Sequence, residues 1–163
     1  MLHHSFLVSK AITQYDFGPK ASLSTSAGGA EAICYDSVNL KTVAFYRYNA
    51  TNIYASVLTI AGDGTITTGT PVNIVARNVS DIVCNYDVAS GKILVFYSVG
   101  AGQAYGKVCT VSGTTISAGA EATVDSLNCT GQLTSCYDPI SGKSVVGYRD
   151  STTSKSRKSS KSL

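Results

Sequence analysis

Short runs of alternating or continuous apolar residues recur along this chain and predict β-strands. The most regular runs are KTVAFYRY, KILVFYSV and KSVVGYR, which begin at Lys41, Lys92 and Lys143. They carry apolar residues on both faces, so we expect them to be strands that are covered on both sides. No stretch keeps the 3.6-residue apolar period of an amphipathic helix over two or more turns. The pattern therefore predicts an all-β protein.

The runs return at a fixed interval of 51 residues. This interval carries a series of aromatic residues, a series of aspartates before predicted turns and a series of lysines after them. The aromatic series, which we expect to form the repeat core, is Tyr35, Tyr86, Tyr137, Tyr46, Tyr97, Tyr148, Phe45 and Phe96; the aspartates are Asp36, Asp87 and Asp138; the lysines are Lys41, Lys92 and Lys143. A period near 50 residues is typical of propellers and other repeat arrays.

Each repeat has the pattern of four antiparallel strands in a meander, which is the form of a propeller blade. Gly91 and Gly142 follow the first strand of their repeats, where a tight turn needs a left-handed residue. Leu40 holds that place in the first repeat. We expect Asn39 beside it to adopt the left-handed conformation instead.

The 51-residue register also assigns the two ends of the chain. Residues 2–18 match the third and fourth strands of a repeat, and residues 131–149 match the first and second. We therefore expect one β-propeller-like domain over residues 1–150, with full repeats at about 30–80 and 81–130 and a third blade completed by the two half-blades. Unpaired strand edges seek partners, so these ends predict assembly with other copies, as a ring or as an open filament.

Charge is scarce and unevenly placed. Charged residues make up 14% of the chain, against a usual figure of about 25%. The basic tail at 151–163 holds four of the positive charges, so the rest of the chain is close to −1 although the total is +3. We expect no nucleic-acid partner, because no basic face is present, and no membrane span. The tail has no apolar residue before Leu163 and predicts a solvated end, with a basic arm for an acidic partner as the alternative.

Candidate chemistry is limited to the repeated polar residues. Asp36, Asp87 and Asp138 each open a turn, which favours capping of backbone N–H groups over a carboxylate cluster. The tyrosines favour packing between blades over a ring of sugar-binding sites, and the lysines are expected to be solvated. His3 and His4 are the only histidines and form no catalytic pattern with Ser, Cys or Asp. We expect no catalytic, cofactor-binding or metal-binding residues.

The cysteines and the sequons leave alternatives open. The five cysteines are Cys34, Cys84, Cys109, Cys129 and Cys136. They lack metal-ligand spacing, and they are either small buried residues or members of one or two disulfides. Three N-x-[ST] sequons, at Asn49, Asn78 and Asn128, fall in predicted loops and are candidate N-glycosylation sites of a glycoprotein.

The segments YDPISGKSVVGYRD, from Tyr137 to Asp150, and YGKVCTVSGTTISAG, from Tyr105 to Gly119, resemble a known repeat. That repeat occurs in tail-fibre and other virion proteins of marine phages and in uncharacterised extracellular proteins, with the pattern YDPxTGKVVVxYRD and then YGTAxVGTVSGTSISFG. Leu40 and Cys109 stand where the pattern has glycine. The resemblance covers nearly all of residues 2–150, implies blade-like repeats and carries over no catalytic residue.

These features together predict a non-enzymatic building block of an extracellular or virion appendage. Such a fibre or filament protein assembles with copies of itself by strand or blade complementation. A carbohydrate-binding propeller lectin or adhesin that recognises cell-surface glycans is the alternative, and a glycosidase-type enzyme is a more distant one. Three blades are too few to close a propeller alone, because closed propellers have roughly four to eight.

Overall fold

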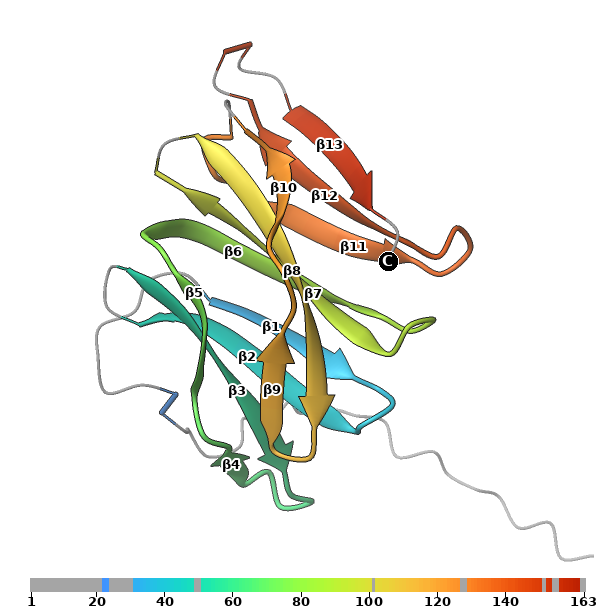
Figure 1. Ribbon diagram of the computed structural model, residues 1–163. Coiled ribbons are helices and arrows are strands. Elements are labelled where there is room, and N and C mark those ends of the chain that lie inside the picture. Colours follow the sequence, from blue (N-terminus) through green and yellow to red (C-terminus); the bar gives the residue numbers. More distant parts are fainter. Residues whose placement is uncertain are drawn as a thin grey trace, which may run out of the picture.

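The computed structural model describes residues 22–23, 31–48, 51–100, 102–126, 129–150, 152–153 and 156–161. Within these ranges the chain forms β-strands, turns and short connections, and the strands build three antiparallel sheets (Figure 1). The sheets follow one another along the chain. The prediction of an all-β, antiparallel protein is confirmed.

The first sheet is a meander whose last strand is split in two. Its strands are β1 (Glu31–Asp36), β2 (Lys41–Tyr48), β3 (Asn52–Ile60), β4 (Ile66–Thr68) and β5 (Val72–Ala76). Both β4 and β5 pair with β3. Gly69 lies at the break and donates its N–H to the Val57 carbonyl oxygen at 2.8 Å. A Cβ on Gly69 would lie 2.2 Å from the Thr114 carbonyl oxygen of the next repeat, so the backbone there leaves room only for glycine.

The second sheet repeats this layout. Its strands are β6 (Val79–Asp87), β7 (Lys92–Val99), β8 (Gln103–Ser112), β9 (Thr115–Ala118) and β10 (Ala122–Asp125). Here β8 pairs with both β9 and β10. Gly119 stands at the break and donates its N–H to the Val108 carbonyl oxygen at 2.8 Å, as Gly69 does in the first sheet. Strands β2 and β7 begin and end at the same residues as the apolar runs KTVAFYRY and KILVFYSV, which were predicted to be strands.

The third sheet contains β11 (Thr134–Asp138), β12 (Lys143–Arg149) and β13 (Ser156–Lys161). Strand β13 comes from the basic tail and pairs along β12. The tail is therefore a paired strand over residues 156–161, although Ser156, Arg157 and Lys158 remain exposed to solvent as expected. It also changes the expected pairing, because β13 occupies the edge of β12 that the half-blade at 2–18 was expected to fill. Residues 2–18 themselves lie outside the described residues.

A buried carboxylate explains why a strand without apolar residues docks there. Asp150 ends the motif YRD and accepts the backbone N–H groups of Thr152 at 2.8 Å and Thr153 at 3.0 Å. It also forms an ion pair with Arg157 on β13. Capping of this turn and the ion pair together hold the tail against β12.

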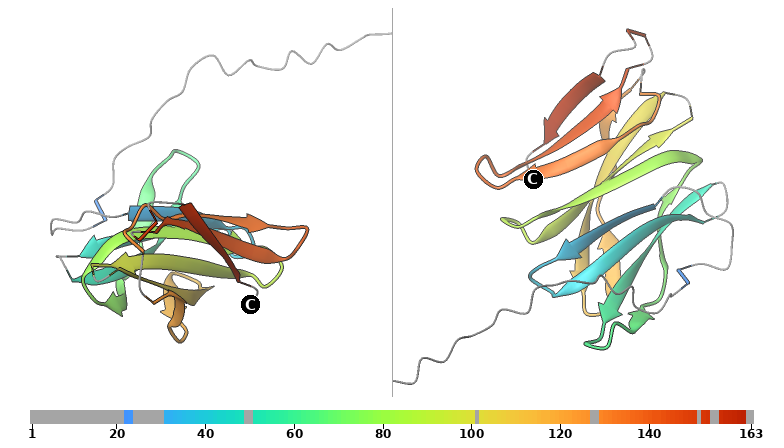
Figure 2. Two further views of the ribbon diagram at one scale, coloured as in Figure 1. Left: turned by 90° about the horizontal axis from the view of Figure 1, so that it is seen from above. Right: turned by 180° about the vertical axis from the view of Figure 1, so that it is seen from behind.

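The three sheets lie side by side in the order of the sequence (Figures 1 and 2). Strand β6 contacts β1 on one side and β11 on the other. The first strand of each repeat thus meets the first strand of the next, and this contact places the polar residues described below.

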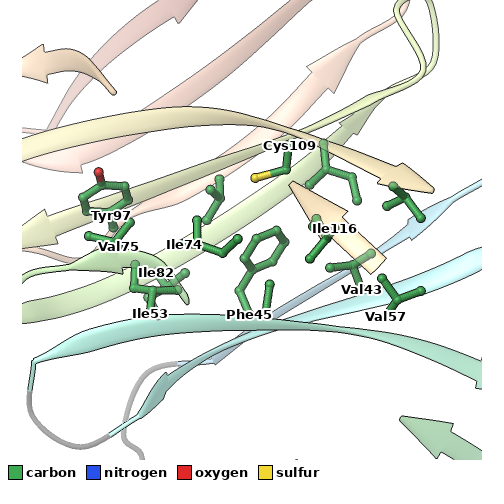
Figure 3. Close-up of a cluster of buried hydrophobic side chains, with 14 of the residues drawn as sticks. Val43, Phe45, Ile53, Val57, Ile74, Val75, Ile82, Tyr97, Cys109 and Ile116 are labelled. Atoms are coloured by element: carbon green, nitrogen blue, oxygen red, sulfur yellow. The ribbon is translucent and has the colours of Figure 1, made fainter. Parts of the chain in front are cut away.

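Two apolar clusters fill the spaces between the sheets. The first joins the first and second sheets: Phe45 and Val57 point towards Cys109 and Ile116 across one layer of side chains (Figure 3). The second joins the second and third sheets. Its buried members are Leu94, Phe96, Ala104, Cys129, Leu133, Val146 and Tyr148.

Most of the predicted repeat core is buried. This holds for Phe45, Phe96, Tyr46, Tyr97 and Tyr148, whereas Tyr86 and Tyr137 are half-buried. Tyr35 is 53% exposed and is not a core residue. The reason is positional, since no earlier repeat lies against β1 within the described part of the chain.

The first turn departs from the expectation in one residue. Leu40 itself adopts the left-handed conformation, with φ of 53°, and Asn39 does not. Gly91 and Gly142 hold the same conformation in the other repeats, with φ of 67° and 65°. Asn39 has a different part in the turn, because its side chain binds Asp36.

Candidate functional site: the seam between repeats

The seam is the contact between the first turn of one repeat and the first strand of the next. Its centre in the first repeat is Asp36, whose side chain is buried. Asp36 Oδ1 accepts the backbone N–H groups of Val38 at 3.0 Å and Asn39 at 2.9 Å. Its Oδ2 accepts Asn39 Nδ2 at 2.8 Å. The carboxylate thus caps the turn, which is the arrangement expected of an aspartate at this place.

A tyrosine of the next repeat completes this seam. The Tyr86 hydroxyl oxygen, from β6, accepts the backbone N–H of Val38 at 3.3 Å. This places the phenol beside the Asp36 carboxylate, which accepts the same N–H, and the two groups shift each other's pKa. Tyr86 therefore joins the second sheet to the first turn.

The second seam repeats the first. Asp87 accepts the backbone N–H groups of Ala89 at 2.9 Å and Ser90 at 3.2 Å. Tyr137, from β11, lies beside this turn, since β11 contacts β6, and the neighbouring phenol lowers the pKa of Asp87. Aspartate and tyrosine are thus paired one repeat apart, twice in succession.

These contacts keep the aspartates charged. Burial raises the pKa of Asp36, but hydrogen bonds from Asn39, Tyr86 and Val38 outweigh it and leave the pKa below its usual value. Burial likewise opposes the hydrogen bonds at Asp87, and its pKa is also lowered. The phenols shift in the opposite sense, since burial and the neighbouring carboxylate raise the pKa of Tyr86. The seam is therefore a neutral phenol that donates to a carboxylate, a charge-assisted hydrogen bond.

A pair of thiols lies beside the first seam. Cys34 on β1 and Cys84 on β6 both pack against the first apolar cluster where β1 contacts β6, and the neighbouring Cys84 together with burial raises the pKa of the Cys34 thiol. Both thiols are free. The second seam has polar partners nearby, where Ser144 Oγ donates to Asn85 Oδ1 at 2.8 Å in a buried position.

The seam is only half made at each end of the described repeats. Tyr35 is the counterpart of Tyr86 and Tyr137, and its hydroxyl has no hydrogen-bond partner among the described residues. Asp138 is the counterpart of Asp36 and Asp87, and it accepts from its own turn, from the Ile140 N–H at 2.9 Å and Ser141 Oγ at 2.8 Å. Among the described residues, Tyr35 thus has no aspartate of a preceding repeat beside it, and Asp138 has no tyrosine of a following repeat.

A second candidate site is a cavity of about 190 Å³ between the second and third sheets. Glycines line much of it, together with Ser80, Ser98 and Thr130. Ser98 is buried, and its hydroxyl has no partner within the described part of the chain. The cavity is small and has both polar and apolar walls, which fits a compact ligand with polar groups or ordered water.

A polar cluster borders the first apolar cluster, and its groups pair with one another. The Tyr97 hydroxyl donates to Glu121, and Arg77 pairs with the same carboxylate at 3.0 Å. Arg77 also lies over the Tyr105 ring, 4.7 Å from its centroid. Because Glu121 is already engaged by two partners, we assign this cluster to packing rather than to acid–base chemistry.

The remaining predicted residues are placed as follows. All three lysines were expected to be solvated. Lys143 is exposed. The amines of Lys41 and Lys92 instead donate to Thr59 Oγ1 and Thr110 Oγ1, both at 2.9 Å. The sequon residue Asn78 is exposed in the connection between β5 and β6. Asn49, Asn128, His3 and His4 lie outside the described residues.

The sequence did not indicate the anchoring role of Asp150 or the pairing of Asp36 with Tyr86. The motif YRD is visible in the chain, but its aspartate has no counterpart in the other repeats. Among the described residues no three His, Cys, Asp or Glu side chains are grouped closely enough to hold a metal ion. The same part of the chain contains no helix long and apolar enough to span a membrane.

Comparison with protein-family models, with curated proteins and with solved structures finds no match to this chain.

Proposed function

We propose that this chain is a structural building block of an extracellular or virion appendage that assembles with copies of itself. One observation carries the proposal: among the described residues the seam is made twice between repeats, and it is half made at the first and the last described repeat. A repeat array with complementary unfinished ends has a surface for a neighbour at each end. Such a head-to-tail contact gives a ring if it closes and a filament if it does not.

In this proposal each sheet is one blade of a propeller-like array. The order of the sheets and the contacts of β6 with both β1 and β11 support it. The similar split of the last strand at Gly69 and Gly119 supports a common blade design. Three blades per chain are fewer than a closed propeller contains, so closure requires further copies.

The appendage role draws on the resemblance to repeats of phage virion and extracellular proteins. We assign no catalytic residue, cofactor or metal, because the polar clusters of the described residues pair among themselves. The partner is then the chain itself, at a virion surface or outside the cell. The exposed Asn78 would accept a glycan only in a cell that glycosylates secreted proteins.

A carbohydrate-binding role is the second candidate, and the cavity beside Ser98 favours it. A buried hydroxyl without a described partner is available for a hydrogen bond from a sugar hydroxyl. A glycan array tests this candidate. Binding that is lost in Ser98→Ala, with folding unchanged, would favour the lectin over the building block.

Negative-stain electron microscopy of the purified chain tests the building-block role. We expect rings or filaments with a regular repeat at micromolar concentration. Particles that remain single, small and unassociated over the whole concentration range would contradict it.

A further inference from the structure

We propose that a second copy of this chain docks so that Tyr35 of one copy reaches Asp138 of the other and continues the seam. This inference rests on the proposed self-assembly and names the surface and the register by which it occurs. It differs from strand donation, because the contact is made by side chains of β1 and of the turn after β11.

The register follows from the two internal seams. The Tyr86 hydroxyl accepts the Val38 N–H of the turn that Asp36 caps, and β11, which carries Tyr137, contacts β6, which ends at Asp87. In both seams the tyrosine stands 50 positions after the aspartate of the preceding turn. Tyr35 and Asp138 occupy the same places in the first and last repeats. Tyr35 and Asp138 could therefore form one further seam. They lie in the first and the last described repeat, so they can meet only between two copies.

The chemistry of the two groups is complementary. Asp138 accepts two hydrogen bonds from its own turn, whereas an ionised carboxylate has about four acceptor positions. Hydrogen bonds from Ser141 and Ile140 lower the pKa of Asp138, so it is charged at neutral pH. The Tyr35 hydroxyl has no hydrogen-bond partner among the described residues, so within them it is available as a donor.

The thiol pair gives a second point of the same contact. Cys34 meets Cys84 inside the chain. In the repeat register the counterpart of Cys34 in the last repeat is Cys136, and the counterpart of Cys84 in the first is Ile33. Cys136 is exposed, and Ile33 is 60% exposed although it is large and apolar. The continued seam therefore places Ile33 of one copy beside Cys136 of the next.

The opposite edge of the third sheet is unsuited to the alternative contact, the addition of another strand. Strand β13 is an edge strand with the sequence SRKSSK, and charged edge strands discourage the addition of another strand. The apolar part of the new contact is also smaller than inside the chain. Gly147 takes the place that Phe96 and Phe45 fill in the other repeats. We therefore expect association that is specific in register but reversible.

Disulfide trapping tests the register. Ile33→Cys recreates the internal thiol pair across two copies, and two thiols react with oxidised glutathione to give one disulfide and two molecules of reduced glutathione. We expect I33C to form a ladder of covalent oligomers on a non-reducing gel, at least tenfold more than wild type. The ladder should disappear when Cys136→Ser is added. Wild type has no thiol at position 33 and should give no ladder.

Ile60→Cys is the matched control, because Ile60 is a similarly exposed isoleucine, at 55%, that lies on β3 rather than on β1. Cross-linking of I33C that does not exceed that of I60C, in a protein that still self-associates by light scattering, would overturn the proposed register and leave self-assembly intact. A wild-type chain that does not self-associate would instead overturn the proposed function.

Discussion

Truncation of Phe96 should measure how much the packing of the third sheet on the second contributes to the free energy of unfolding. Phe96 lies on β7, is 2% exposed and belongs to the cluster that includes Val146 and Tyr148 of the third sheet. Loss of the buried ring costs roughly 1.5–3 kcal/mol in transfer free energy, and the space left behind adds a further term. A cavity of about 40 Å³ already borders Phe96 and Gly106, so the truncation enlarges an existing void. We expect Phe96→Ala to lower the free energy of unfolding by about 3–5 kcal/mol.

Urea unfolding followed by tyrosine fluorescence is a suitable assay, because the chain has ten tyrosines and no tryptophan. Ile140→Ala is the matched control, since Ile140 is a large apolar residue that is 97% exposed. Its effect should stay within about 0.5 kcal/mol. A loss below about 1 kcal/mol for F96A would refute the packing of these two sheets.

Three further predictions concern the turns and the break in the last strand. Leu40→Gly should raise the free energy of unfolding by about 0.5–1 kcal/mol, because it removes a left-handed leucine that is 70% exposed, and urea titration measures it. Gly69→Ala should lower the melting temperature, because its Cβ would meet the Thr114 carbonyl oxygen, whereas Gly62→Ala, with open space around it, should not. The pKa values of Asp36, Asp87 and Asp138 are lowered in the folded chain, so their contribution to stability is full above about pH 4 and is lost as the pH falls through the lowered values. Urea midpoints between pH 6 and pH 2 should therefore decrease on acidification, and Asp36→Asn should flatten the decrease; a pH-independent midpoint would contradict this.

The strands could be predicted from the sequence because their burial leaves a pattern in it. The run from Lys92 to Val99 is apolar on both faces, and β7 has the same bounds. Strand β13 has no such pattern, because it is held by backbone pairing and by Asp150 rather than by apolar side chains. Leu40 was also unpredictable, since the position needs a left-handed residue and the fold imposes it on leucine.

The seam could be predicted only in part. The recurrence of Tyr35 and Asp36 with their counterparts is visible in the sequence, and so is the turn that each aspartate caps. The pairing of each aspartate with the tyrosine of the following repeat requires the placement of one sheet on another, which periodicity does not contain. The exposure of Tyr35 was missed for the same reason: the first described repeat has the residues of a core position, but no earlier repeat among the described residues covers them.

Sedimentation velocity on wild type, Tyr35→Phe and Asp138→Asn, from sub-micromolar to high micromolar concentration, tests the central claim most directly. Asp63→Asn is the matched control, because Asp63 also caps an exposed turn, accepting the Thr65 N–H at 2.9 Å. Loss of one charge-assisted hydrogen bond should weaken association about tenfold in Y35F and D138N and leave D63N unchanged.

A mixture of the two variants gives the sharpest readout, because the intact Asp138 of Y35F can meet the intact Tyr35 of D138N. We expect wild type to form species heavier than the 17.0 kDa chain as its concentration rises, each variant to remain closer to the monomer, and the equimolar mixture to regain a dimer. A wild-type chain that sediments as a single 17.0 kDa species at every concentration, or variants that associate as wild type does, would contradict the account.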